Sequence, residues 1–331
     1  MATPVSAPAE EVLDPDLPIC DAHHHLWDDT GHTGTPYPLD ALLADTGSGH
    51  RVLRTVFVEC HAHYLADGPV ELRPVGEVRY VAAAAESSAT LGGAEIAAIV
   101  GHADLTLGAA VGDVLDTLDD AGRGRFRGVR HTTAHDPSPM NNAATRSGLM
   151  GEATFRHGVD ALGIRGRSFD AFCFHPQLDE LAALACACEG TTIVANHLGV
   201  PIAGGPYRGR SEEVRSVWRT ALRGVAGCPN VVVKLGGITR PLSGDRWDRR
   251  GVPASSEEIV AAWGDDIRFV IDTFGPARCM FESNFPVDAS VVGYVALWNA
   301  FKKIAAPFTA AERVDLFHDT AARTYRLPTL N

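Results

Sequence analysis

A run of three histidines near the N-terminus contains the residues best suited to chemistry. Asp21-Ala22-His23-His24-His25 directly follows the apolar run 17–20, which is typical of a strand. Because strand side chains alternate between faces, His23 and His25 are predicted to point the same way and His24 elsewhere. Two neutral imidazoles at i and i+2 can bind one divalent ion. The spacing favours a metal site over a chance histidine run in a loop.

The rest of the chain must supply a scaffold that positions these side chains. Its 331 residues are 45% hydrophobic and 21% charged, and its net charge of -12 argues against a nucleic-acid or anionic-membrane surface. A small anionic substrate remains compatible, because a few local arginines can outweigh a distant field. Residues 1–15 are predicted to be a flexible leader and 16–331 one domain. Seven cysteines without paired spacing predict reduced thiols in a cytoplasmic protein.

Eight short apolar runs alternate with helical patterns. Alternation of this kind predicts a parallel sheet, and eight strands favour a closed (β/α)8 TIM barrel over a doubly wound open sheet. Capping-box signatures start helices at Ser255 and Thr309. The predicted strands are 18–20, 54–59, 96–101, 126–130, 170–174, 192–196, 230–235 and 279–283.

Most of the fourteen histidines fall at one rim of this predicted barrel. Ten of them end a predicted strand or follow it closely, and in barrels this rim carries the active site. They are His23, His24, His25, His61, His63, His102, His131, His135, His175 and His197. Long polar segments follow the strands at 27–37, 131–146 and 236–253, so Trp27 and Arg240 are predicted to contact substrate.

Several motifs, in order along the chain, resemble the amidohydrolase superfamily, and its branch of lactone-hydrolysing and decarboxylating barrels in particular. The branch includes pyrone-dicarboxylate hydrolase and sugar-lactone hydrolases. The resemblance rests on Asp21-Ala22-His23-His24-His25-Leu26-Trp27, Val56-Phe57-Val58-Glu59, Phe126-Arg127-Gly128-Val129-Arg130-His131, Asn196-His197-Leu198-Gly199 and Met280-Phe281-Glu282-Ser283-Asn284-Phe285-Pro286.

This resemblance implies roles for four histidines. His23 and His25 match the metal pair of the first strand, and His175 matches the position of a third ligand in many members. His197 matches a histidine that binds metal or polarises the substrate carbonyl. The implied cofactor is one divalent ion, Zn²⁺ or Mn²⁺, although the branch also includes members that open lactones without a metal.

The eighth strand departs from the family pattern. Asn284 occupies the position where the family usually has an Asp that acts as general base, and an amide cannot accept a proton as a carboxylate does. The base then comes from Glu282, Asp288 or a histidine; or the chemistry needs no strong base; or the site only binds. Asp288 is expected to fold back over the site, and Glu282 shares a face with Asn284 only if the strand bends.

Charged residues at other strand ends are candidates for holding the substrate. Glu59 is expected to hydrogen-bond the imidazoles or to pair with Arg130. Arg130 and His131 are expected to face the pocket, where an arginine fork suits a substrate carboxylate. Lys234 is a candidate for substrate contact, with an ion-paired barrel lysine as the alternative.

The sequence therefore predicts a hydrolase that opens a carboxylate-bearing lactone at a mononuclear metal site or at a metal-free His/Arg site. A metal-dependent decarboxylase or other lyase on the same barrel is the first alternative. A catalytically retired binding protein is the second, and Asn284 is the residue that motivates it. A homo-oligomer is compatible with this sequence.

Overall fold

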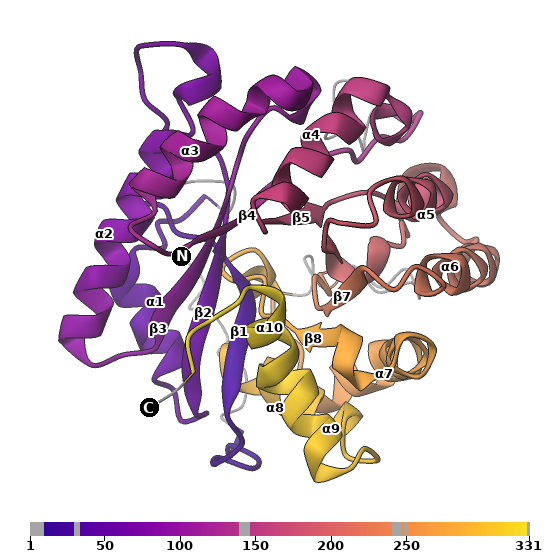
Figure 1. Ribbon diagram of the computed structural model, residues 1–331. Helices are drawn as coiled ribbons and strands as arrows, with labels where there is room; N and C mark the ends of the chain where they lie inside the picture. Colours follow the sequence, from indigo (N-terminus) through magenta and orange to yellow (C-terminus); the bar gives the residue numbers. More distant parts are fainter. Residues whose placement is uncertain (1–9, 30–33, 139–145, 240–246, 248–250, 330–331) are drawn as a thin grey trace.

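Eight parallel strands surround the centre of the molecule in the computed structural model, which describes residues 10–29, 34–138, 146–239, 247 and 251–329 (Figure 1). The strands are hydrogen-bonded in sequence order, which confirms the predicted barrel and rules out the doubly wound order. They are β1 (Ile19–His24), β2 (Val52–Val58), β3 (Glu95–Gly101), β4 (Phe126–Arg130), β5 (Ser168–Ala171), β6 (Ile193–Ala195), β7 (Val231–Leu235) and β8 (Cys279–Phe281).

The ring of strands closes just beyond β8. His24 forms a parallel bridge with Phe285, the His25 N–H donates to the Phe285 carbonyl at 2.8 Å, and the Asn284 N–H donates to the His23 carbonyl at 2.9 Å. The residues that follow β8 therefore fix the carboxyl end of β1. This pairing brings the histidine run beside Asn284.

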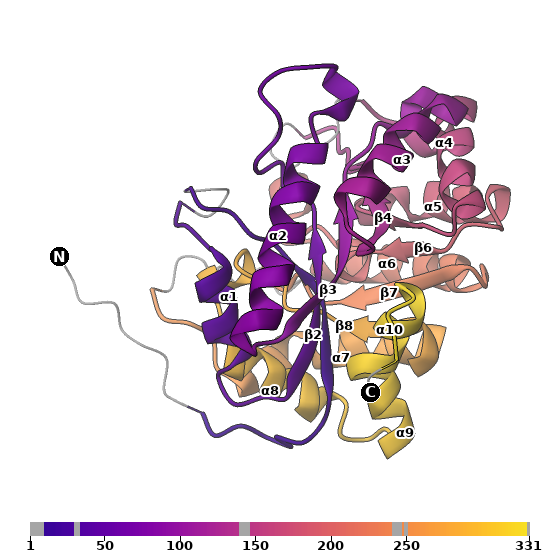
Figure 2. The ribbon, with the colours of Figure 1, turned by 60° about the vertical axis from the view of Figure 1, so that its left-hand side comes forward.

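A helix follows each strand and covers the outside of the barrel (Figures 1 and 2). The two predicted capping boxes are present: the Glu258 N–H donates to Ser255 Oγ and the Glu312 N–H to Thr309 Oγ1, both at 3.3 Å. The helices are α1 (Leu39–Thr46), α2 (Val75–Leu91), α3 (Gly112–Ala121), α4 (Ala153–Ile164), α5 (Leu178–Ala187), α6 (Ser211–Ala226), α7 (Ser256–Phe274), α8 (Tyr294–Ile304), α9 (Ala310–Val314) and α10 (Thr320–Thr324).

The interior of the barrel changes from apolar to charged along the strands. Apolar side chains from β1, β2, β3, β6 and β8 form one buried cluster with Tyr325, the residue after α10. The adjacent Arg326 reaches Gly166, which precedes β5, so the C-terminal segment covers the amino ends of the strands. Toward the carboxyl ends the buried interior side chains include Asp170, Lys234 and Glu282. The fold therefore collects buried charge at the end where barrel active sites lie.

A β-bulge in β1 sets the direction of the histidines. Asp21 is paired with Thr55 and His24 with Phe57, so β1 advances three residues while β2 advances two. Ala22 belongs to the interior cluster, and the His23 ring lies next to the interior Lys234. His24 instead contacts the ring of Phe57 in the outer apolar layer. The extra residue turns His23 inward instead of outward.

Part of the expected leader is attached to the barrel. The Ser256 N–H donates to Glu10 Oε1 at 2.8 Å, and the Leu13 N–H donates to Asn299 Oδ1 at 2.9 Å. These contacts fix residues 10–13 against α7 and α8, and residues 1–9 lie outside the described part. Among the helices of the described residues, none is both long enough and apolar enough to cross a membrane.

Candidate active site

A cavity of about 470 Å³ lies at the carboxyl ends of the strands. Its walls come from the ends of seven strands or the segments after them, so it occupies the centre of the rim where the sequence predicts an active site. The lining residues are His25, Glu59, Cys60, His61, Arg130, Thr132, Phe172, His197, Val200, Gly237, Thr239, Asn284 and Val287.

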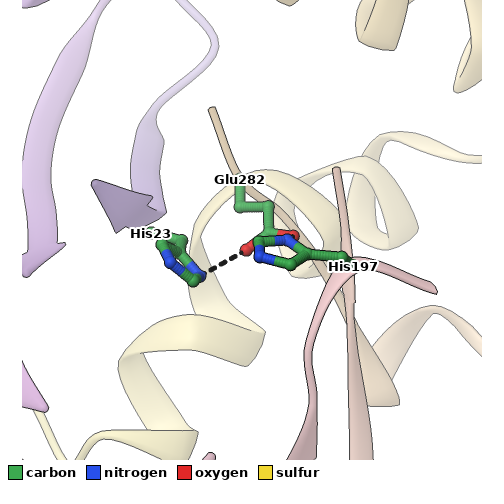
Figure 3. A group of neighbouring side chains, drawn as sticks. All are labelled: His23, His197 and Glu282. Carbon is green, nitrogen blue, oxygen red and sulfur yellow. Dashed lines mark hydrogen bonds and ion pairs between the residues drawn. The ribbon is translucent and has the colours of Figure 1, made fainter. Parts of the chain in front are cut away.

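Glu282 holds two imidazoles, those of His23 and His197 (Figure 3), and His197 lines the cavity. Glu282 Oε2 lies 2.9 Å from His23 Nδ1, and Glu282 Oε1 lies 2.6 Å from His197 Nδ1. Glu282 and His23 are fully buried, and His197 is 9% exposed. Burial, followed by the charge of Lys234, lowers the pKa of His23 well below its usual value. A neutral imidazole is the form that binds a metal or a proton.

These three side chains are the described group best placed to hold a metal ion. One atom from each of His23, His197 and Glu282 lies within 4.8 Å of the others. Two imidazoles and a carboxylate are a common set of ligands for Zn²⁺ and Mn²⁺. Both Glu282 oxygens face imidazole nitrogens, Oε2 at 2.9 Å from His23 Nδ1 and Oε1 at 2.6 Å from His197 Nδ1, so one ion could replace the protons that these atoms share. The donor set therefore fits one divalent ion.

An unusual turn presents His197. His197, Leu198 and Val200 have φ values of 53°, 59° and 38°, a left-handed backbone that costs about 1–3 kcal/mol per residue. The Trp218 indole donates to the Leu198 carbonyl at 2.7 Å and holds this turn. On the other side, a Cβ at Gly237 would lie 2.6 Å from His197 Cβ. Glycine at 237 therefore allows the ring to sit where it does.

Arg130 is bound to Glu59 across the cavity wall. Its Nε donates to Glu59 Oε1 at 2.7 Å, its Nη2 donates to the Glu59 carbonyl, and its Nη1 lies 3.4 Å from His23 Nε2. Burial opposes ionisation of Glu59, but the charge of Arg130 lowers the pKa of its carboxyl. Of the two alternatives for Glu59, the structure shows the pair with Arg130, and the imidazole near its other oxygen is that of His61, with Nε2 3.6 Å from Oε2. The arginine fork expected to clamp a substrate carboxylate is already occupied.

Lys234 lies below the cavity instead of lining it. Its ammonium is fully buried and donates to Asp170 Oδ2 at 2.8 Å, which is the ion-paired alternative for this residue. Asp170 also accepts from the Tyr325 hydroxyl at 2.8 Å and from Ser168 Oγ at 3.1 Å. Lys234 Nζ is 3.5 Å from His23 Nδ1, so its influence on the site passes through that ring.

Asn284 faces the cavity and Asp288 supports it from behind. The Asn284 amide donates to Asp288 Oδ1 at 2.8 Å, and the Ile238 N–H donates to Asp288 Oδ2 at 2.8 Å. Asp288 is fully buried, and burial raises its pKa to about 7. It therefore does not fold over the mouth as expected. Because β8 ends at Phe281 and Asn284 has a φ of 55°, Glu282 and Asn284 both face the interior.

His25 is oriented from behind. Its Nδ1 lies 2.8 Å from the Val58 carbonyl, which can only accept, so Nδ1 carries the proton and Nε2 carries the lone pair. Burial, followed by the charge of Arg130, lowers the pKa of His25 well below its usual value. Trp27 stacks behind this ring and donates to the Thr35 carbonyl at 2.8 Å. Its indole supports His25 and does not line the cavity.

Two other predicted site residues lie elsewhere. His175 accepts from the Ile202 N–H at 3.3 Å and packs against Tyr207, outside the group formed by Glu282. His131 accepts from the Leu105 N–H at 3.2 Å and lines a neighbouring cavity. Arg240 is outside the described residues.

Sequence reasoning missed Asp170 and Tyr325. A carboxylate within the apolar run 168–174 is a usable signal, because a buried charge requires a partner. The identity of that partner was not readable, since Lys234 and Tyr325 lie 64 and 155 residues away.

Comparisons with known proteins agree with this geometry. A family model described as Amidohydrolase matches residues 20–327. The Sinorhizobium fredii protein named "Uncharacterized protein y4mH" is 30% identical over 326 residues, which are 94% of this chain and 99% of that protein. The L-fucono-1,5-lactonase of Burkholderia multivorans is 30% identical over 236 residues, 71% of this chain and 73% of that enzyme. A crystal structure of an amidohydrolase from Burkholderia multivorans with bound Zn has a TM-score of 0.73 and 25% identity, and the match covers 94% of this chain and 99% of that one.

Proposed function

This chain belongs to the amidohydrolase family, and we propose that it is a hydrolase that opens the ring of a carboxylate-bearing lactone. The observation that carries the proposal is the buried Glu282 carboxylate that holds His23 and the cavity-lining His197. The similarity to an L-fucono-1,5-lactonase supports a cyclic ester as the reacting group.

The charges around the cavity point to Glu282 as the reactive carboxylate. Glu59 is neutralised by Arg130 and Asp170 by Lys234. Glu282 contacts only imidazoles among the ion pairs of the described residues. A buried carboxylate without a fixed cation favours whatever brings positive charge, which is a protonated imidazole or a metal ion.

The arrangement of atoms suits activation of water. A carboxylate only accepts hydrogen bonds, so His197 Nδ1 donates to Glu282 and His197 Nε2 keeps its lone pair. We assign His197 as the base that takes a proton from water as the water oxygen attacks the lactone carbonyl. The ring C–O bond then breaks, and His197 returns the proton to the leaving oxygen. Because the Asn284 amide nitrogen is committed to Asp288, its Oδ1 is the group offered to the water.

The same three side chains would also hold a divalent ion. When bound to His23, His197 and Glu282, Zn²⁺ or Mn²⁺ would supply polarisation of the lactone carbonyl. Elemental analysis of the purified protein tests this part. Three results together would support the metal form: about one equivalent of metal in the wild-type protein, loss of that metal in Glu282→Gln, and loss of activity when a chelator removes the metal. Full activity in metal-free protein would support the Glu282–His197 pair acting alone.

Product analysis tests the reaction class. We expect purified protein to convert a lactone that carries a carboxylate to a hydroxy acid, heavier by one water. Release of CO2 without gain of water would replace the proposal with the decarboxylase alternative. If no lactone or aromatic acid reacts, Asn284→Asp is the deciding variant, because restoring the usual base would create activity in a retired site.

A further inference from the structure

A second cavity, of about 540 Å³, adjoins the cavity beside Glu282, which we call the reactive cavity. The two share a wall of aromatic side chains. His61 lines the reactive cavity, and its ring lies 5.7 Å from the ring of His102 and 5.4 Å from that of Tyr64, both of which line the second cavity. A substrate held at Glu282 could therefore extend past His61 into this space.

Among the described residues, the reactive cavity offers no free clamp for the carboxylate of the proposed substrate. Arg130 uses Nε and Nη2 on Glu59, and its remaining nitrogen faces the His23 ring. A second anion there would compete with Glu59, whose carboxylate and backbone carbonyl already accept hydrogen bonds from the guanidinium. The group that recognises the substrate's negative charge is therefore to be sought outside the Arg130 pair.

Arg73 in the second cavity has the required properties. It is half-buried, and it takes part in no ion pair that the structure shows among the described residues. Its Nε and the Tyr64 hydroxyl are buried donors without a hydrogen-bond partner in the described part of the chain. Unpartnered buried donors are costly, so two of them in one cavity point to an acceptor from a ligand.

The other charges of this cavity are compensated or exposed. The Asp104 side chain is 45% exposed and accepts from the Thr106 N–H at 2.9 Å, and Arg146 pairs with Glu152 at 2.7 Å. Glu71 is exposed, where water screens its charge more than it screens the half-buried Arg73. The inner part of the cavity is therefore the more positive part.

The rim of the cavity is apolar. Val70 is 71% exposed and Leu107 is 40% exposed, and both line the opening. A donor-lined interior with an apolar rim suits an anionic group carried on a hydrocarbon body.

We propose that the second cavity binds an anionic group of the substrate, a carboxylate or a phosphate, through Arg73 and Tyr64 while the ring to be opened lies at Glu282. The assignment rests on the proposed function for the identity of the reacting group only. The anion site itself depends on Arg73 and can be tested without turnover.

Equilibrium binding of simple probes provides the test. Glutarate, inorganic phosphate and the neutral glutaramide are titrated into protein with labelled histidines, whose NMR signals separate the second cavity (His102 and His131) from the reactive cavity (His25 and His197). The variants are Arg73→Gln, Arg73→Lys and Glu71→Gln. Arg125→Gln, at the amino end of β4, is the matched control.

The expected results have opposite signs for the two charge variants. Glutarate or phosphate shifts the NMR signals of His102 and His131. Arg73→Gln raises the Kd of the anion about tenfold or more, and Arg73→Lys raises it less. Glu71→Gln lowers the Kd, because it removes a negative charge from the cavity. Arg125→Gln leaves the Kd unchanged. The anion with the lower Kd shows whether the substrate's anionic group is a carboxylate or a phosphate. Equal binding of glutaramide, shifts confined to His25 and His197, or an unchanged Kd in Arg73→Gln would overturn the assignment. Anion binding here without hydrolysis of any lactone would contradict the proposed function and leave the site in place.

Discussion

Asp170 and Glu282 are two buried carboxylates inside one barrel, and their surroundings differ. Asp170 has a lysine at 2.8 Å and hydroxyl donors from Tyr325 and Ser168. Glu282 has two imidazoles and no fixed cation among the described residues. The barrel neutralises one carboxylate completely and leaves the other dependent on groups that exchange protons or bind metals. The contrast separates a charge that serves stability from a charge that serves chemistry.

Removing the base on the Glu282 side is expected to have the largest effect. His197→Gln should lower kcat/KM for the lactone by about 10²–10⁴-fold, because general-base catalysis contributes that much. His175→Gln is the matched control, since that ring contacts Ile202 and Tyr207 outside the group. Steady-state kinetics on the two variants measures the difference. Equal losses in both variants would contradict the assignment of His197.

Removing the cation on the Asp170 side should affect stability. Lys234→Met leaves a buried carboxylate unpaired, which typically costs about 3–5 kcal/mol of unfolding free energy. Urea denaturation measures the loss, and Asp170→Asn in the same chain should recover part of it. If Lys234→Met were as stable as the wild type but inactive, Lys234 would serve the reaction and not the stability of the fold.

A smaller effect is expected from the residue that leaves room for His197. Gly237→Ala would place a methyl group 2.6 Å from His197 Cβ and Cγ, so the ring must shift. A misplacement of this kind costs up to about 10²-fold in rate. Gly251→Ala is the control, because Gly251 has the same φ of 68° with no neighbour within 4 Å. If both variants lose the same activity, backbone strain and not the position of His197 is responsible.

A pH-dependent effect on stability is expected from Asp288, which supports Asn284 from behind. Its pKa is raised from 3.8 to about 7, so the folded state keeps a proton that the unfolded chain releases. The stabilisation is fully present below the unfolded value and is lost as the pH rises through about 7. The difference in unfolding free energy between the wild type and Asp288→Asn should therefore decrease as the pH rises from 3.8 to about 7. Denaturant titrations at several pH values measure it, and a pH-independent difference would refute it.

The order of strands was predictable from local pattern, but the assembly of the site was not. The run 126–130 matches β4 residue for residue, because it lies between the glycine-containing segment 122–125 and the polar segment that starts at His131. β1 was expected to end at Cys20, yet it continues to His24 because Phe285 pairs with it across the closure. Such pairing depends on residues more than 250 positions apart.

The members of the site were named from the sequence, and their grouping required the structure. His23, His197 and Glu282 were all candidates, but which of them meet depends on the bulge in β1, the left-handed turn at His197 and the short β8. His175 carries the same local signals as His197 and lies elsewhere. Backbone irregularities of this kind leave little trace in hydrophobic periodicity.

The central claim is that the Glu282 carboxylate holds the imidazoles of His23 and His197 in the position and protonation state that the reaction requires. The most direct test compares the rate of lactone opening by wild-type protein and Glu282→Gln, with the unfolding free energy measured on the same preparations. We expect Glu282→Gln to fold with nearly wild-type stability and to lose about 10²-fold or more of the rate. A folded Glu282→Gln protein that opens the lactone at the wild-type rate would contradict the claim.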